Sequence, residues 1–201
     1  GTLGVAHVSC LVEQAKILFA EAEYNNLDWE VLNERWHRFD TCSLCEQRYH
    51  GVVKCALGWA CWKTNLSRPE TDQVRYMAMN LLGNGLYDAE RHEEALSVRE
   101  AELSWLRRLG ADQKRVLATQ NNLATTYQAL GRDEEGLSMQ RDVYFGRLKL
   151  LGEKHENTLS SGINYAAALV RLKRFEDSKS LVLITIPVAR RVLGESHEVT
   201  L

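Results

Sequence analysis

The spacing of apolar residues predicts helices along most of the chain. Leu123, Tyr127 and Leu130 follow one another at intervals of four and three, which places them on one face of a helix. Gly131 is expected to end this helix, because glycine adopts the left-handed conformation of a helix C-terminus at little cost. Asp133 follows as a candidate N-cap of a second helix. The segment therefore predicts two helices joined by a short turn.

This hairpin pattern recurs along the chain every 42 residues. The spacing relates three leucine–glycine pairs at the ends of second helices, and further pairs of like residues: Leu109-Gly110, Leu151-Gly152 and Leu193-Gly194; Asn122 and Asn164; His155 and His197; Thr158-Leu159 and Thr200-Leu201. A fixed period of this length indicates a repeat architecture, in which no unit can bury its apolar face alone. Arrays of this kind serve mostly as binding surfaces. The expected fold is an all-α array of helical hairpins.

The repeats are expected to occupy residues 69–201, as three 42-residue units and the start of a fourth that begins just before Leu201. The first unit is less regular, because one residue has slipped within one of its helices. In the last complete unit, Pro187 removes a backbone hydrogen bond and predicts a kink. We expect Ile184, Val188 and Val192 to be buried on either side of it.

Residues 1–68 form a separate region that carries all five cysteines. Apolar spacing predicts an amphipathic helix over residues 5–25, a second helix capped by Asp28 and a third from about Val52 to Leu66. Pro69 is expected to stop the third helix. These helices are compatible with a further helical-repeat pair.

Residues 69–201 resemble the tetratricopeptide repeat, in the long 42-residue form found in kinesin light chains. The matching residues are the Asn121–Ala124 run, Gly131-Arg132, the leucine–glycine pairs and the histidines followed three residues later by Thr-Leu. Gly136 and Asp133 depart from the family, which prefers alanine and an aromatic residue there. The resemblance implies a right-handed solenoid whose first helices line a concave groove for a protein or peptide partner.

In that family a groove asparagine binds the backbone of an extended peptide. Carried onto this chain, the asparagine corresponds to Asn122 and Asn164, and Asn84 and Thr125 would share the groove one turn further along. An amide suits this role because it offers both a donor and an acceptor. The alternative is that these side chains satisfy neighbouring helix ends or face water. The implied function is a protein-interaction scaffold, or a structural subunit of a multiprotein assembly.

The N-terminal region has a second resemblance, to the C-terminal half of a RING-CH zinc domain. A Gly1-Thr2 pair precedes His7 and Cys10 at x2 spacing, and Cys42-x2-Cys45 is followed by an aromatic residue four positions on. The resemblance implies that His7 and Cys10 serve one zinc ion, and Cys42 and Cys45 another. Thiolate and imidazole groups suit tetrahedral zinc.

Three departures make any such zinc sites incomplete. The first four cysteines of the family are absent, the segment between Cys10 and Cys42 is longer than its normal spacing, and Gln14 replaces its tryptophan. The resemblance nevertheless implies an alternative function. The chain would be the substrate-recognition part of a RING-CH-type E3 ubiquitin ligase whose first zinc ligands lie upstream.

Two further interpretations of the cysteines do not depend on the RING-CH resemblance. From residue 42 to residue 55 the spacing Cys-x2-Cys-x4-His-x4-Cys is that of a zinc knuckle, a nucleic-acid module, although Glu46 stands where a glycine is expected. Alternatively, Cys55 and Cys61 are thiols buried against Trp59 and its neighbours.

The composition argues against several classes of partner and activity but identifies no reaction. The formal net charge of −2 gives no reason to expect nucleic acid or a membrane surface as a partner, and no apolar run approaches the length of a membrane span. No phosphate loop, Gly-x-Ser-x-Gly or His-Glu-x-x-His motif occurs, so we expect no catalysis from this segment. An odd number of cysteines and no secretory signal indicate an intracellular, cytoplasmic protein. Gly1 in place of an initiator methionine suggests a segment of a longer chain.

Overall fold

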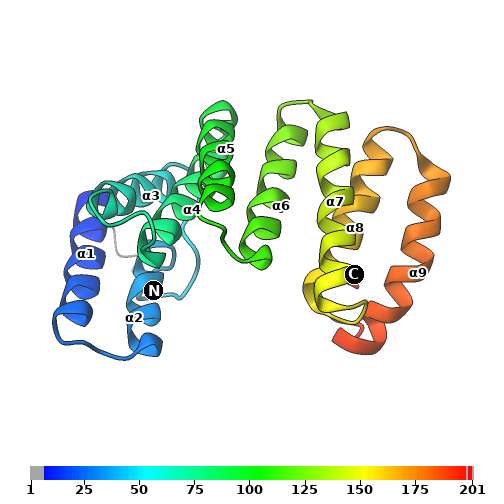
Figure 1. The fold of residues 1–201 in the computed structure, drawn as a ribbon. Helices are drawn as coiled ribbons and strands as arrows, with labels where there is room; N and C mark the ends of the chain where they lie inside the picture. Colours follow the sequence, from blue (N-terminus) through cyan, green and yellow to red (C-terminus); the bar gives the residue numbers. More distant parts are fainter. Residues whose placement is uncertain (1–6, 198, 201) are drawn as a thin grey trace. The chain divides into compact units, whose positions relative to one another are not determined.

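The structure is a computed structural model that describes residues 7–197 and 199–200, and these residues form an all-α fold (Figure 1). The helices are α1 (Val8–Tyr24), α2 (Trp29–Trp36), the 3-10 helix η1 (His37–Phe39), α3 (Gly51–Asn65), α4 (Gln73–Asp88), α5 (His92–Arg108), α6 (Gln113–Ala129), α7 (Asp133–Leu151), α8 (Glu156–Arg171) and α9 (Phe175–Leu193). The predicted fold class is confirmed. The chain divides into two compact units, Gly1–Val98 and Arg99–Leu201, each described by itself.

Helix ends in the second unit follow the sequence pattern with one correction. Gly131 has a φ of +74°, as its predicted place after α6 requires. Asp133, however, is the first residue of α7 rather than its cap, which is Arg132 without a side-chain cap bond. The Asp133 carboxylate instead accepts a bond of 2.7 Å from Arg171 of α8. The aspartate therefore ties two successive repeats together.

The histidine that recurs with the repeat caps a helix. His155 precedes α8, and its Nδ1 atom accepts the backbone N–H of Asn157 at 3.1 Å. The Nδ1 atom of His197 accepts the N–H of Val199 in the same way at 3.3 Å. A ring nitrogen thus satisfies one of the free donors at a helix start.

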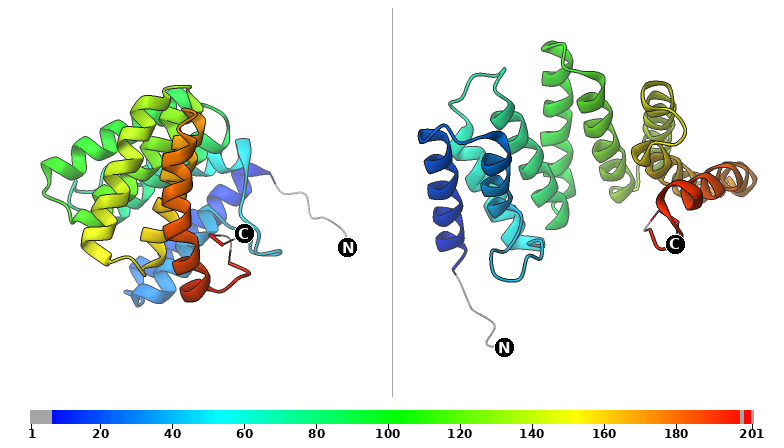
Figure 2. Two further views of the ribbon diagram at one scale, coloured as in Figure 1. Left: turned by 90° about the vertical axis from the view of Figure 1, so that its right-hand side faces the viewer. Right: turned by 90° about the horizontal axis from the view of Figure 1, so that it is seen from below.

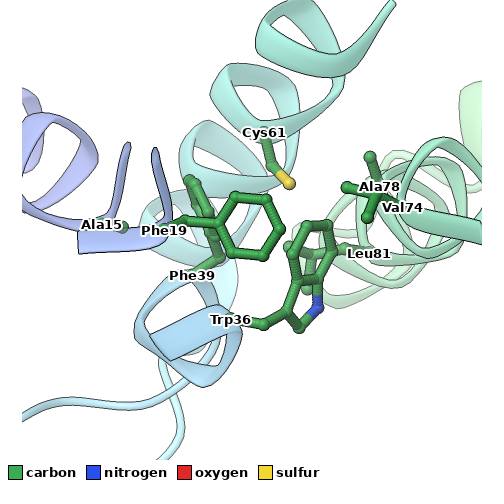
Figure 3. Packing of buried hydrophobic residues seen from close by; sticks show 8 residues of the cluster. All are labelled: Ala15, Phe19, Trp36, Phe39, Cys61, Val74, Ala78 and Leu81. Atoms are coloured by element: carbon green, nitrogen blue, oxygen red, sulfur yellow. The ribbon is translucent and has the colours of Figure 1, made fainter. Parts of the chain in front are cut away.

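The core of the first unit lies among α1, α2, α3 and α4. Figure 3 shows the Phe19 and Trp36 rings next to each other, and their centroids are 5.2 Å apart in an edge-to-face arrangement. Phe39 and Cys61 complete the inner layer and are almost completely buried. Asp28 caps α2 as predicted, accepting the N–H of Val31 at 3.0 Å. Aromatic burial of this size dominates the stability of a small helical unit.

Two glycines let α3 and α4 pack backbone to backbone. A Cβ atom at Gly58 would lie 3.0 Å from the carbonyl oxygen of Leu81, and one at Gly85 would lie 2.8 Å from that of Lys54. Gly58 lies later in α3 than Lys54 but contacts a position earlier in α4, so the two helices run antiparallel. The contact leaves no room for a larger residue at either glycine.

The second unit consists of successive antiparallel hairpins. The views of Figures 1 and 2 agree that α6 lies beside α7 and α8 beside α9. A Cβ atom at Gly162 of α8 would lie 3.1 Å from the side chain of Thr185 of α9. The Ser178 hydroxyl donates to the carbonyl of Ala166 at 3.0 Å. Small residues thus mark the crossing of α8 and α9.

The predicted burial along α9 was wrong. Ile184 is 67% exposed and Val192 is 42% exposed, while Val188 is half-buried. The residues that α9 buries are the small ones, including Thr185 and Ala189. Short side chains occupy the crossing of α8 and α9, while the bulkier Ile184 and Val192 remain exposed. The helix continues through Pro187 without a break.

None of the helices formed by the described residues combines the length and apolar character that crossing a membrane requires.

Gly85→Ala tests the close approach of α3 and α4. Overpacking against a backbone costs about 1–3 kcal/mol, and alanine's helix preference returns up to about 1 kcal/mol, so the free energy of unfolding should fall by about 1–2 kcal/mol. Urea denaturation followed by tryptophan fluorescence measures the change. Gly146→Ala is the control, because its Cβ would meet only the flexible end of the Leu117 side chain. Equal effects of both changes would contradict the backbone contact.

Candidate functional site

Asn84, one of the predicted groove residues, lines a pocket in the first unit. The pocket has a volume of about 320 Å³ and lies among α2, the loop after η1, α3 and α4. Two further asparagines line it, Asn33 of α2 and Asn80 of α4. The Asn84 amide donates to the Asn80 side-chain oxygen at 3.1 Å, one helical turn away. The pocket therefore carries an amide-lined wall.

The pocket also carries charge that the sequence pattern did not reveal. Asp40 lies 3.6 Å from Arg48 and 3.6 Å from Lys54, so two cations share one carboxylate. Lys54 is largely enclosed, with 14% of its side chain exposed. His37 lines the same pocket, where Asn33 approaches its Nε2 atom at 3.4 Å. The pocket is thus amide-rich with a small positive excess.

Sequence reasoning missed Asn33, Asn80 and the three charged lining residues. The spacing of four between Asn80 and Asn84 was a usable indication, since it places both amides on one face of α4. The charged residues come from other parts of the chain, so only the folded protein brings them to these amides.

In the second unit, the remaining predicted residues lie on α6 and α8 and are half-buried. The Asn164 amide donates to the side-chain oxygen of Asn121 at 3.2 Å. The Thr125 hydroxyl donates to the carbonyl of Asn122 at 2.7 Å. Asn164 therefore contacts Asn121, which directly precedes Asn122, the residue at the same position as Asn164 in the preceding repeat. Asn121 was not predicted, although it stands next to Asn122.

A buried arginine holds the backbone beside these amides. Arg99 is 4% exposed, and its guanidinium donates to the carbonyl of Asn122 at 2.6 Å and to the Thr126 hydroxyl. A charged donor makes a stronger bond than a neutral one. The position of Asn122 on α6 is therefore fixed from the α5 side.

Cys42 and Cys45 lie in a tight turn after η1. The Leu44 amide donates to the Cys42 sulfur at 3.4 Å, and the Glu46 amide donates to the Cys42 carbonyl at 3.0 Å. Glu46 has a φ of +58°, in the left-handed region where knuckles carry glycine. The pKa of Cys42 is lowered because the amides of Leu44 and Cys45 donate to its sulfur. The turn thus favours a thiolate.

The zinc-knuckle grouping of Cys42, Cys45, His50 and Cys55 was wrong. Cys55 is buried against Leu82 and Leu86 in the core of the first unit. Among residues 7–197 and 199–200, no group of three or more His, Cys, Asp or Glu side chains is placed to hold a metal ion.

The remaining cysteines separate into buried and exposed thiols. The prediction that Cys55 and Cys61 are buried is confirmed, and burial raises the pKa of Cys61 to about 12. His7 and Cys10 stand exposed at the start of α1. The Gly1-Thr2 pair of the RING-CH resemblance, and Leu201, lie outside the described residues.

Comparison with known families supports the repeat interpretation. Residues 116–157 match the tetratricopeptide repeat family, a stretch equal in length to the period seen in the sequence. It contains two of the predicted groove residues, Asn122 and Thr125. No curated protein matches the chain in sequence.

Solved structures with the same fold include kinesin-light-chain-like proteins. Two structures of a Podosopora anserina protein, described as a putative kinesin light chain with nearly identical TPR-like repeats, match with a TM-score of 0.63 and 16% identity. Each match covers 98% of this chain and 82% of that one. BtubC (BKLC) from P. vanneervenii matches with a TM-score of 0.62 and 15% identity, over 73% of this chain. The match spans 60% of BtubC.

These findings establish the fold. Residues 116–157 match the tetratricopeptide repeat, and the helices of the chain pack in a fold similar to that of solved TPR-like repeat proteins. Because the match to the Podosopora anserina structures covers almost the whole chain, the helices of the N-terminal region share this fold. Neither the family match nor these structures supports the RING-CH resemblance or its ligase function.

Proposed function

We propose that the protein is an interaction scaffold that binds extended segments of a protein partner on its asparagine-bearing helix faces, α4 in the first unit and α6 and α8 in the second. The observation that carries this proposal is the pocket of the first unit, where Asn33, Asn80 and Asn84 surround a hollow of about 320 Å³. An extended peptide has unpaired backbone donors and acceptors, and side-chain amides complement both. The cytoplasm is the proposed location, in keeping with an odd number of cysteines, which does not suit a disulfide framework.

The charges in the pocket favour a partner segment with a carboxylate. Arg48 and Lys54 share Asp40, which leaves one positive charge in excess before His37 is considered. A peptide carboxylate would complete this arrangement, because charge-assisted bonds are stronger than neutral ones. Binding should then weaken as salt rises.

In the second unit, Asn122, Thr125 and Asn164 are the proposed contacts. Asn164 uses one amide hydrogen on Asn121, and an amide has two donors and two acceptor lone pairs. The pair therefore retains capacity for a peptide backbone. Arg99 and Thr126 secure the Asn122 segment from behind, so the side chains would bind without reordering α6.

Selection from a random peptide library displayed on phage, followed by fluorescence anisotropy, tests the proposed function. Asn84→Ala should weaken the selected peptides about 5- to 30-fold, the effect of about 1–2 kcal/mol from unpaired backbone groups. Asn164→Ala should weaken peptides that bind the second unit to a similar extent.

Asn25→Ala provides the matched control, because this exposed asparagine lies at the end of α1, outside the proposed peptide surfaces. Circular dichroism should show unchanged helicity in all three variants. Selected peptides that bind the Asn84→Ala and Asn164→Ala variants as tightly as the parent chain would refute the proposal.

We further propose that Cys42 and Cys45 provide two thiolate ligands to a zinc ion, and that His7 and Cys10 are the alternative pair. Two thiols at x2 spacing fit half of a tetrahedral site. Amide donors on the Cys42 sulfur favour the thiolate that a metal needs. Since no third ligand joins them among the described residues, the rest of the site must come from elsewhere.

Elemental analysis of the purified protein tests this zinc site. We expect about one zinc ion per chain, lost in Cys42→Ser and kept in Cys10→Ser. Retention of zinc in Cys42→Ser with loss in Cys10→Ser would move the metal to the other pair. A folded protein without zinc would rule out both pairs as metal sites.

A further inference from the structure

A pocket in the second unit has basic side chains and no carboxylate among the described residues that line it. It has a volume of about 180 Å³ and forms where the start of α6, the end of α7 and the start of α8 meet. Its polar lining comes from Lys114, Arg147, His155 and Asn157, and its walls are leucines and an alanine. The pocket therefore combines positive charge with apolar walls.

Arg147 is the central cation of this pocket. Its guanidinium donates to the backbone carbonyl of Asn157 at 3.1 Å, and no described carboxylate lies within ion-pair distance of it. Burial lowers the pKa of Arg147, and no neighbouring anion offsets that effect. A partly desolvated charge without a counter-charge is costly, and an anion in the pocket would remove that cost.

His155 offers a donor of defined orientation. Its Nδ1 atom accepts the Asn157 amide at 3.1 Å, which assigns the ring proton of the neutral form to Nε2. Lys114 adds an ammonium group from α6. Lysine, arginine and imidazole donors from three parts of the unit thus border one small volume.

This arrangement is specific to one junction of the array. At the equivalent positions one repeat further on, Lys114 is replaced by Glu156 and Arg147 by Ala189. The helix-capping histidine persists in both places, as His155 and His197. The two cations are therefore not required by the hairpin fold, and packing alone does not account for them.

We propose that this pocket binds a tetrahedral oxyanion of the phosphate class, carried by a phosphorylated side chain of a partner or present as free phosphate. Three donor groups from α6, α7 and the turn before α8 suit the several acceptor oxygens of a phosphate group. The apolar walls limit water and strengthen the charge interaction. The site is independent of the proposed asparagine surfaces and does not require them to bind a peptide.

Thermal melting and calorimetry on the whole chain test this proposal at constant ionic strength, because added salt alone screens charges. Inorganic phosphate at tenfold excess over its Kd should raise the melting temperature by about 3–6 °C relative to chloride. Arg147→Met should abolish that rise without lowering the melting temperature of the free protein. Lys114→Met should weaken phosphate binding by about tenfold.

Lys149→Met is the matched control, since Lys149 is exposed on the same helix as Arg147 and outside the pocket. It should leave the phosphate response unchanged. Titration with a phosphoserine peptide and its serine counterpart distinguishes the sources. Tighter binding of the phosphopeptide than of inorganic phosphate assigns the site to a protein partner, and equal binding assigns it to the free anion. No phosphate response, or a response that survives in Arg147→Met, would overturn the proposal.

Discussion

The fold depends on short side chains where neighbouring helices cross. Each helix has an apolar face that it cannot bury alone, and the next helix in the chain supplies the cover. Gly58 and Gly85 bring α3 and α4 into backbone contact, and Gly162 lies against Thr185 between α8 and α9. Close approach buries the most apolar area for a given helix length, and it leaves little choice of residue at the crossing points.

This mode of packing also explains where the polar side chains collect. Small and apolar residues occupy most of the helix contacts, with buried polar exceptions such as Arg99. Many of the other amides and charges therefore lie on faces that no neighbouring helix covers. Asn80 and Asn84 reach a pocket in the first unit, while Asn121 and Asn164 meet on separate helices of the second. The proposed binding surfaces follow from the same division between buried and uncovered faces.

The sequence pattern predicted the helices better than it predicted the surfaces. Helical spacing and glycine ends predicted α6 to α9, because these features depend on neighbours along the chain. The pattern failed for Ile184, which hydrophobicity alone would bury but which is exposed, while the neighbouring Thr185 is buried at the contact with α8. It also missed Arg48, Lys54 and Arg147, whose significance depends on residues far away in sequence. The turn at Cys42 was predictable only in part. The sequence shows the x2 spacing of Cys42 and Cys45, but only the structure shows the hydrogen bond from the Leu44 amide to the Cys42 sulfur.

The central claim is that the pocket amides recognise a partner backbone. Side-chain amide resonances in a two-dimensional ¹H–¹⁵N NMR spectrum, recorded while a selected peptide is added, test it most directly. The account predicts shifts for Asn33, Asn80 and Asn84 when the peptide binds the first unit, with the amide of Asn25 unchanged. Peptide binding that leaves the pocket amides unchanged, or that shifts Asn25 instead, would contradict it.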